Sequence, residues 1–243
     1  MGEGMETDAA LFPFISSANI ACGAHAGDQA TMRRTVELAV RHGVAIGAHP
    51  SYPDRERFGR TDILGSDLSI TQLEDSLYEQ LRLLDDVCRG LGVHMRHVKP
   101  HGALYNRAAR DATVSGLIAR VVADYDAGLL LYGLSGSGMA PAAAAAGLAF
   151  ISEVFADRTY QPDGSLTPRS EPGALITDSA QAVEQVLTMV RDGRVNTPAG
   201  DVGITAETIC LHGDGAHAVE FAELIHRALV AAEVRIAAPG IKE

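Results

Sequence analysis

Short apolar runs alternate with longer amphipathic runs along most of the chain. A short apolar run is typical of a strand buried on both faces, and a longer run with helical spacing is typical of a helix that covers it. The pattern predicts six strands, at Phe14–Cys22, Val44–His49, Arg96–His101, Leu129–Leu134, Leu148–Val154 and Thr208–His212. It predicts six helices, at Gln29–His42, Gln72–Gly90, Ala112–Tyr125, Met139–Ala146, Ser179–Asp192 and Ala216–Ala232.

Residues that favour helix ends support these bounds. Residues that can cap a helix start stand at Asp28, at Thr71 with Glu74 and at Asp178 with Gln181. Glycines that can end a helix stand at Gly43, Gly90 and Gly193.

Regular alternation of strand and helix predicts a parallel sheet with right-handed crossovers. An open nucleotide-binding sheet would be favoured by GxGxxG or GxxxxGK[ST], and the sequence contains neither motif. Polar residues instead follow many of the strands, which favours a barrel whose site lies at one end of the ring. We therefore expect one α/β domain over residues 1–243, folded as a (β/α) barrel.

The six predicted strands are too few for such a ring, which takes about seven or eight. Met1–Asp8 is a glycine- and acid-rich, turn-like segment with no strand ahead of it. We expect the first strand of the barrel to be missing from this chain. The alternative is that a weak strand at Val234–Ala237 closes the ring.

Composition and charge indicate which partners and which cellular setting to expect. A net charge of −11 argues against nucleic acid or an anionic membrane as a partner. Cys22, Cys88 and Cys210 are too widely spaced for a disulfide framework or a CxxC site, and we interpret Cys210 as core packing. The sequence shows neither a signal peptide nor an apolar run long enough to cross a bilayer, so we expect a reduced, cytoplasmic setting.

The stretch Arg96–Asn106, RHVKPHGALYN, carries the strongest chemical signal. Alternation along a strand places His97, Lys99 and His101 on one face. Burial of unpaired amines and imidazoles is costly, so a core strand gains nothing from them unless they have a function. An apolar setting would lower the pKa of Lys99 and make it a candidate base or oxyanion-stabilising charge. The structural alternative is an ion pair with Glu153.

The first two strands also end in candidate residues. In SSANIACGAHAGD, small residues flank His25 and leave room for a ligand, and Asn19 shares its parity. His49 stands at the end of the second strand, before a loop rich in proline and charge. Arg57, Phe58 and Arg60 in that loop belong either to a lid or to a solvated surface.

The last two strands add carboxylates, an arginine and a histidine. Glu153 and Asp157 share a face if the strand continues that far. Arg158 suits a bidentate grip on a carboxylate or phosphate, or else a buried pair with Glu153. His212 beside Asp214 suits general acid–base work with the carboxylate orienting the imidazole, although Asp214 can instead cap the final helix.

Histidines near carboxylates also bind metals. His25, His49, His101 and His212 could hold a divalent ion, but none has the HExxH spacing of a helical zinc site. The sequence therefore leaves a metal open, and we assign no residue to one.

Five motifs in order, SSANIACGAHAGD, GAHPSYPDRERFGR, HVKPHGALYN, EVFADRTYQPDGSLTPR and TICLHGD, strongly resemble the LamB/YcsF family. The resemblance covers nearly the whole chain, from Gly2 to about Ala232. It implies a seven-stranded β/α barrel related to glycoside hydrolase and polysaccharide deacetylase barrels. Family members usually begin with a strand reading roughly DLNxDLGEG, and this chain starts at the GEG portion, which agrees with a missing first strand.

The resemblance also implies a function. It implies one subunit of a three-component, ATP-dependent enzyme that opens 5-oxo-L-proline to L-glutamate, with subunits B and C as partners. With no nucleotide-binding motif here, phosphoryl transfer from ATP is expected to depend on those partners. A homo-oligomer is left open by the sequence.

On this hypothesis the site of lactam opening lies in this chain. Lys99 and His101 would stabilise the oxyanion and move protons, Glu153 or Asp157 would orient water, and Arg158 would hold the substrate carboxylate. The pocket would be completed by His25 and His49, with substrate contacts from Asn19, His212 and Asp214. The competing hypotheses are a stand-alone, metal-dependent hydrolase of the deacetylase kind and a non-catalytic subunit of the complex.

Overall fold

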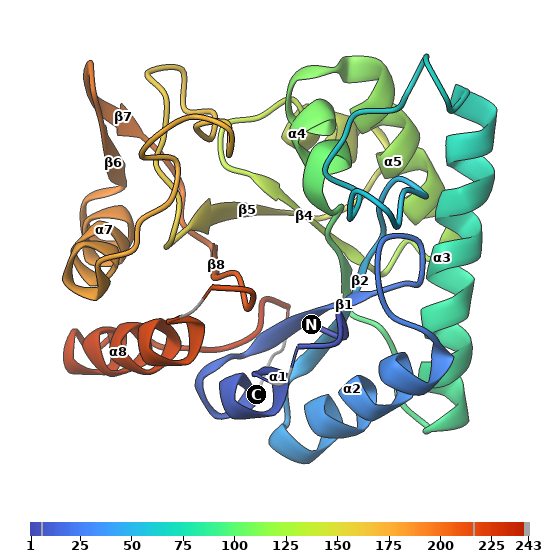
Figure 1. Cartoon of the computed structure of the whole chain (residues 1–243), viewed down its shortest axis with the longest axis horizontal. Helices are drawn as coiled ribbons and strands as arrows, with labels where there is room; N and C mark the ends of the chain where they lie inside the picture. The colour runs from blue at the N-terminus through green and yellow to red at the C-terminus, as the bar shows by residue number, and fades with distance from the viewer. Residues whose placement is uncertain (6, 216, 241–243) are drawn as a thin grey trace.

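A curled parallel sheet forms the centre of the computed structural model, which describes residues 1–5, 7–215 and 217–240 (Figure 1). Its strands are β1 (Ser17–Ala21), β2 (Ala45–His49), β3 (His97–Val98), β4 (Leu130–Leu134), β5 (Phe150–Phe155) and β8 (Thr208–Cys210). They pair in the order β1-β2-β3-β4-β5-β8, and every pairing is parallel. All six carboxyl ends therefore point to the same end of the curled sheet, as the barrel prediction requires.

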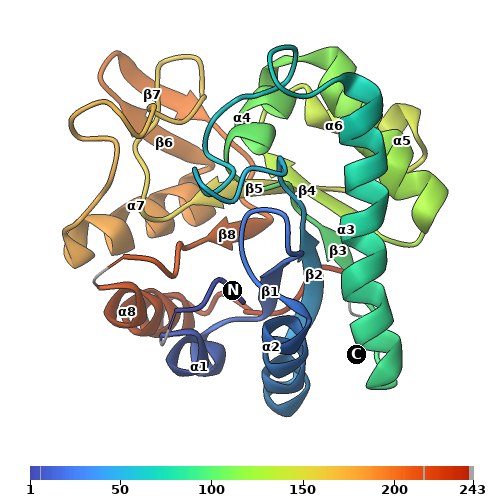
Figure 2. The same ribbon diagram turned by 45° about the vertical axis from the view of Figure 1, so that its right-hand side comes forward.

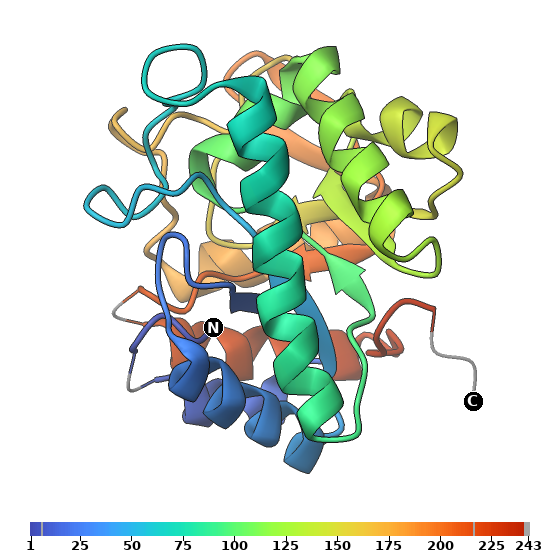
Figure 3. The same cartoon turned by 90° about the vertical axis from the view of Figure 1, so that its right-hand side faces the viewer.

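Helices cover the outside of the sheet (Figure 2). They are α2 (Gln29–His42), α3 (Ile70–Gly90), α4 (Gly102–Arg110), α5 (Ala112–Tyr125), α6 (Met139–Ala145), α7 (Ser179–Asp192) and α8 (Ala218–Ala231). Two short elements, α1 (Asp8–Leu11) and a 3-10 turn at Phe12–Phe14, precede β1. Figure 3 shows α3, the longest of these helices, running along one side of the molecule.

Amphipathic spacing explains how these helices pack. Leu73, Leu77, Leu81 and Leu84 recur on one face of α3, and each side chain is at most 2% exposed. Full burial of a leucine contributes about 1.5–3 kcal/mol before the entropy cost of ordering it. This face joins α2, α5 and the sheet in one continuous core.

The helix-end predictions are partly confirmed. The Asp28 carboxylate accepts a hydrogen bond from Thr31 N, and α2 ends at Gly43 in the left-handed conformation. For α3 the predicted cap was wrong, because the capping box joins Ser69 to Gln72 instead of Thr71 to Glu74.

Several predicted bounds also need correction. The strand expected at Arg96–His101 pairs regularly only at His97–Val98, and α4 begins at Gly102. The hairpin of β6 (Arg194–Thr197) and β7 (Gly200–Gly203) was not predicted, because it is short and largely exposed. Ala216, the predicted start of the last helix, lies outside the described residues.

The ring of described strands is open between β1 and β8. Met1 lies along the free edge of β1, where its amino group donates to Asn19 O at 3.0 Å and its carbonyl accepts from Ala21 N at 3.0 Å. Val234–Ala237 forms no strand, so the alternative closure was wrong. The structure thus agrees with a barrel-type fold that lacks one strand. None of the described helices combines the length and the apolar character needed to cross a bilayer.

Candidate functional site

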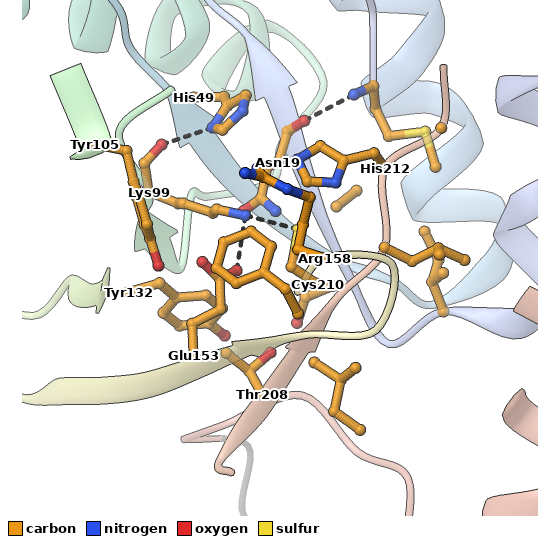
Figure 4. Close-up of a pocket in the computed structure, with 18 of the residues that line it drawn as sticks. Asn19, His49, Lys99, Tyr105, Tyr132, Glu153, Arg158, Thr208, Cys210 and His212 are labelled. Carbon is orange, nitrogen blue, oxygen red and sulfur yellow. Dashed lines mark hydrogen bonds and ion pairs between the residues drawn. The ribbon is translucent and has the colours of Figure 1, made fainter. Parts of the chain in front are cut away.

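A cavity of about 620 Å³ opens at the carboxyl ends of the strands and extends into the gap between β1 and β8. Its wall includes polar side chains from distant parts of the chain (Figure 4). Apolar residues of α8 complete it. Eight residues predicted from the sequence line it: Asn19, His49, Lys99, His101, Glu153, Arg158, His212 and Asp214. Their convergence makes this cavity the candidate functional site.

One part of the wall, the lysine group, consists of Lys99, Tyr105, Glu153 and Cys210. Lys99 Nζ lies 2.7 Å from Glu153 Oε1 and 2.9 Å from Cys210 Sγ, and Lys99 and Glu153 are 4% and 1% exposed (Figure 4). The ammonium also lies 5.6 Å from the centre of the Tyr105 ring. Glu153 Oε2 has no hydrogen-bond partner among the described residues. A buried ion pair with one free carboxylate oxygen faces the cavity.

This ion pair reverses the predicted pKa of Lys99. Burial alone lowers it, but the hydrogen bond to Cys210 Sγ and the negative charge of Glu153 outweigh burial, and the pKa is raised. Burial raises the pKa of Cys210 to about 12, so the sulfur is a thiol at neutral pH. Burial and Glu153 raise the pKa of Tyr105 well above its usual value. Lys99 is therefore a fixed positive charge rather than a base, and the prediction of a lowered pKa was wrong.

The second part, the histidine group, consists of Glu3, His25, His49 and His101. His49 Nε2 lies 3.0 Å from His101 Nδ1, and the His25 ring stacks on His101 with centroids 3.9 Å apart. Glu3 Oε1 lies 3.3 Å from His25 Nε2. His49 Nδ1 donates to the backbone carbonyl of Lys99 at 2.7 Å, so the two groups are directly connected.

Burial keeps most of the histidine group uncharged. It lowers the pKa of His101 to about 3, with a further contribution from the charge of His25. It also lowers the pKa of His49 well below its usual value, together with the charges of His101 and Lys99. For Glu3, burial raises the pKa, but the bond to His25 and nearby positive charges bring it to about 2. At neutral pH two neutral imidazoles face an ionised carboxylate.

Asn19 and Tyr132 line the cavity, and the fully buried His97 packs against both. His97 Nε2 donates to Asn19 Oδ1 at 2.9 Å, and its ring stacks on Tyr132 with centroids 4.1 Å apart. Burial and the charge of Lys99 lower the pKa of His97 to about 3. A Cβ added to Gly47 would lie 2.0 Å from His97 Nε2, so only glycine leaves room for this ring.

At the rim of the cavity, His212 and Asp214 have different partners from those predicted from the sequence. His212 Nδ1 lies 2.8 Å from Asp157 Oδ2, whereas Asp214 lies 2.6 Å from Arg60. Burial raises the pKa of Asp157, but His212 more than offsets this, and the pKa is lowered. Asp157, not Asp214, therefore orients His212. Among the described residues, Asp214 makes no capping bond to α8.

Arg158 does not form an ion pair with Glu153, because the Glu153 carboxylate is paired with Lys99. Arg158 is 4% exposed and donates instead to the backbone carbonyls of Ala174 and Thr167. Burial lowers its pKa, and the charge of Arg169 lowers it further. Both arginines line the cavity, so this side of the wall carries two neighbouring positive charges.

Two predicted residues lie behind the wall. His25 supports His101 by stacking, and Asp157 supports His212. Glu3 was not predicted, because it lies in the segment interpreted as a turn. Cys210 packs in the core as predicted, and it also contacts Lys99, which was not predicted. Phe58, left undecided from the sequence, packs its ring 5.3 Å from His25 and 5.4 Å from His101. Its neighbours in the loop are charged, which concealed this packing role.

Comparisons with known proteins agree with this architecture. The chain is 51% identical over 239 residues to a protein of Neisseria meningitidis serogroup C that is named as the A subunit of 5-oxoprolinase, covering 98% of this chain and 96% of that one. It is 52% identical to the protein of the same name from Tolumonas auensis, covering 96% and 92%. A crystal structure described as a lactam utilization protein, from Thermus thermophilus, superposes with a TM-score of 0.89 at 39% identity, covering 97% and 93%. The family model described as LamB/YcsF family matches residues 1–242, and the chain belongs to that family.

Proposed function

We propose that this chain is the A subunit of an ATP-dependent 5-oxoprolinase and contains the site where 5-oxo-L-proline is opened to L-glutamate. One observation carries the proposal: a buried, permanently charged Lys99 lies in a cavity that also presents neutral imidazoles and a pair of arginines. These are the groups that opening a small anionic lactam requires. The names of the relatives from Neisseria and Tolumonas support the same reaction.

The positive charges give the substrate an orientation. Arg158 and Arg169 would bind the carboxylate of 5-oxoproline, since an arginine fork matches a carboxylate in shape and charge. The lactam carbonyl would then point toward Lys99. A fixed ammonium in a dry site stabilises a developing oxyanion far better than one in water.

Protons would be moved by His212. Water attacks the lactam carbon, the C–N bond breaks, and the ring nitrogen leaves with a proton as the amine of glutamate. His212, oriented by Asp157, would accept the proton that water loses and return it to the leaving nitrogen.

ATP makes this amide reactive enough to open. Phosphorylation of the lactam oxygen by ATP would release ADP and give a better electrophile. After water adds and the C–N bond breaks, a second water would release inorganic phosphate from the resulting acyl phosphate and leave the side-chain carboxylate of glutamate. We assign the phosphorylation to subunits B and C because this sequence contains no nucleotide-binding motif. Those two subunits are the proposed partners.

Reconstitution tests the proposal. The chain is mixed with subunits B and C, ATP and 5-oxoproline, and glutamate is measured. We expect glutamate with the unaltered chain and a loss of about 10²–10³-fold with Lys99→Met, the effect of removing one oxyanion donor. Arg33→Met, which removes an exposed cation on α2, is the matched control and should leave turnover unchanged.

Two other results would favour other functions. Full turnover with Lys99→Met in an assembled complex would make this chain a non-catalytic subunit. Hydrolysis of acetylated sugars by the isolated chain would instead indicate a stand-alone hydrolase.

A further inference from the structure

The hydrogen bonds of the histidine group fix where each ring carries its proton. His49 Nδ1 lies 2.7 Å from Lys99 O, and His101 Nε2 lies 3.0 Å from Phe58 O. A carbonyl oxygen only accepts, so both of these nitrogens must carry hydrogen. Ser51 Oγ donates to Tyr52 O, so His25 Nδ1 is likewise the donor to Ser51, at 2.9 Å.

In the tautomers that these bonds select, the other nitrogen of each ring, His49 Nε2 or His101 Nδ1, carries a lone pair. The two lone pairs face one another at 3.0 Å, so neither ring has a hydrogen to donate to the other. Glu3 adds a carboxylate oxygen, and the three ligand atoms of Glu3, His49 and His101 all lie within 4.8 Å of one another. Acceptors that converge without a donor are joined either by a shared proton or by a metal ion, and a third ligand atom from Glu3 favours the metal ion.

We propose that Glu3, His49 and His101 bind a divalent transition-metal ion, with Zn²⁺ as the type. Two imidazoles and one carboxylate form a known ligand set for zinc hydrolases and for non-haem iron. With metal–nitrogen bonds of about 2.0–2.1 Å, two histidine nitrogens lie about 2.9 Å apart at a right angle and about 3.4 Å apart at the tetrahedral angle. The observed 3.0 Å falls within that range.

The surroundings have the features of an outer shell for such a site. Ligating histidines usually donate their second N–H to a carbonyl or carboxylate, and His49 and His101 both do so. The carbonyl that accepts the hydrogen bond from His101 belongs to Phe58. A φ of 57° is costly for a residue with a side chain, so the backbone at Phe58 is strained. In this conformation the Phe58 carbonyl orients the His101 ring.

The three ligands line the cavity, so a bound ion would keep open positions toward it. There it could polarise a carbonyl or lower the pKa of a bound water. The assignment rests on ligand geometry alone and does not depend on the lactam reaction.

Cobalt binding to the isolated, metal-stripped chain tests the site. Co²⁺ is titrated while its visible absorption is recorded, and Zn²⁺ is then added as a competitor. We expect one saturable site that Zn²⁺ displaces, with affinity lowered by more than about tenfold in His101→Gln and in Glu3→Gln. His212→Gln, a histidine of the same cavity outside the ligand set, is the matched control and should bind like the unaltered chain.

Two variants are used so that a loss of metal binding can be told apart from misfolding. His101 is buried, but the Glu3 side chain is 14% exposed and lies outside the hydrophobic core, so Glu3→Gln should keep its native circular dichroism. The absence of saturable binding, or unchanged affinity in Glu3→Gln, would overturn the proposal and leave a shared proton between His49 and His101. Neither result would affect the glutamate assay.

Discussion

The histidine group and the lysine group stand side by side in one cavity, joined by the bond from His49 to the Lys99 carbonyl. Both are buried, yet burial removes the charge of His49 and His101, whereas Lys99 keeps its charge. The difference lies in the partner. Lys99 has a carboxylate at 2.7 Å, whereas His49 and His101 contact each other at 3.0 Å and the carboxylate of their group, Glu3, is bonded to His25. Desolvation removes a charge unless an opposite charge is supplied within contact distance.

The largest change in the free energy of unfolding is expected in the lysine group. Lys99→Met leaves Glu153 buried without its partner and should lower the free energy of unfolding by about 3–5 kcal/mol. The double variant Lys99→Met/Glu153→Met should recover most of that loss but none of the glutamate formation. Urea unfolding of the three proteins measures this. If the single and double variants were equally unstable, the ion pair would not be the cause.

The packing around His97, the buried histidine next to these two groups, is expected to respond strongly to added volume. Gly47→Ala would place a methyl group 2.0 Å from His97 Nε2 and should destabilise the fold by up to about 3 kcal/mol. Gly116→Ala, in α5 with no atom within 4 Å of the added carbon, is the matched control and should be neutral or stabilising by up to about 1 kcal/mol. Thermal unfolding compares the two. Equal changes in stability for the two variants would show that the packing around His97 adjusts to the added methyl group.

The neutral histidines should also make stability depend on pH. The pKa of His97 is about 3 when folded and about 6.5 as an ordinary side chain, so below pH 6.5 the unfolded chain binds more protons. Stability should be complete above that pH and fall by about 2 kcal/mol for this residue between pH 7 and pH 5. His97→Gln should reduce the slope of unfolding free energy against pH. An unchanged slope would mean that His97 is charged in the folded protein.

The smallest effect is expected at the rim, where water screens both partners. Arg60 and Asp214 lie 2.6 Å apart with side chains 41% and 29% exposed. Exposed ion pairs contribute about 0–1 kcal/mol, so Arg60→Gln should change the free energy of unfolding by less than about 1 kcal/mol. Denaturant unfolding checks this. A larger loss would indicate that the loop around Phe58 depends on this bridge.

The sequence by itself determined the alternation of elements and most of the residues that converge. Bounds of α2, α5 and α7 follow from apolar spacing and caps, because these are local properties. The convergence of Lys99, Glu153, His49 and His101 follows from parallel strands, whose carboxyl ends must share one end of the sheet.

Only the tertiary structure decided which residues pair. Glu153 could have met Arg158 or Lys99, and His212 could have met Asp157 or Asp214, since each choice satisfies the same alternation. The role of Glu3 and the raised pKa of Lys99 depend on contacts between segments far apart in the chain. Electrostatic energies are set by separations of a few ångströms in a dry interior, and a linear pattern does not specify such distances.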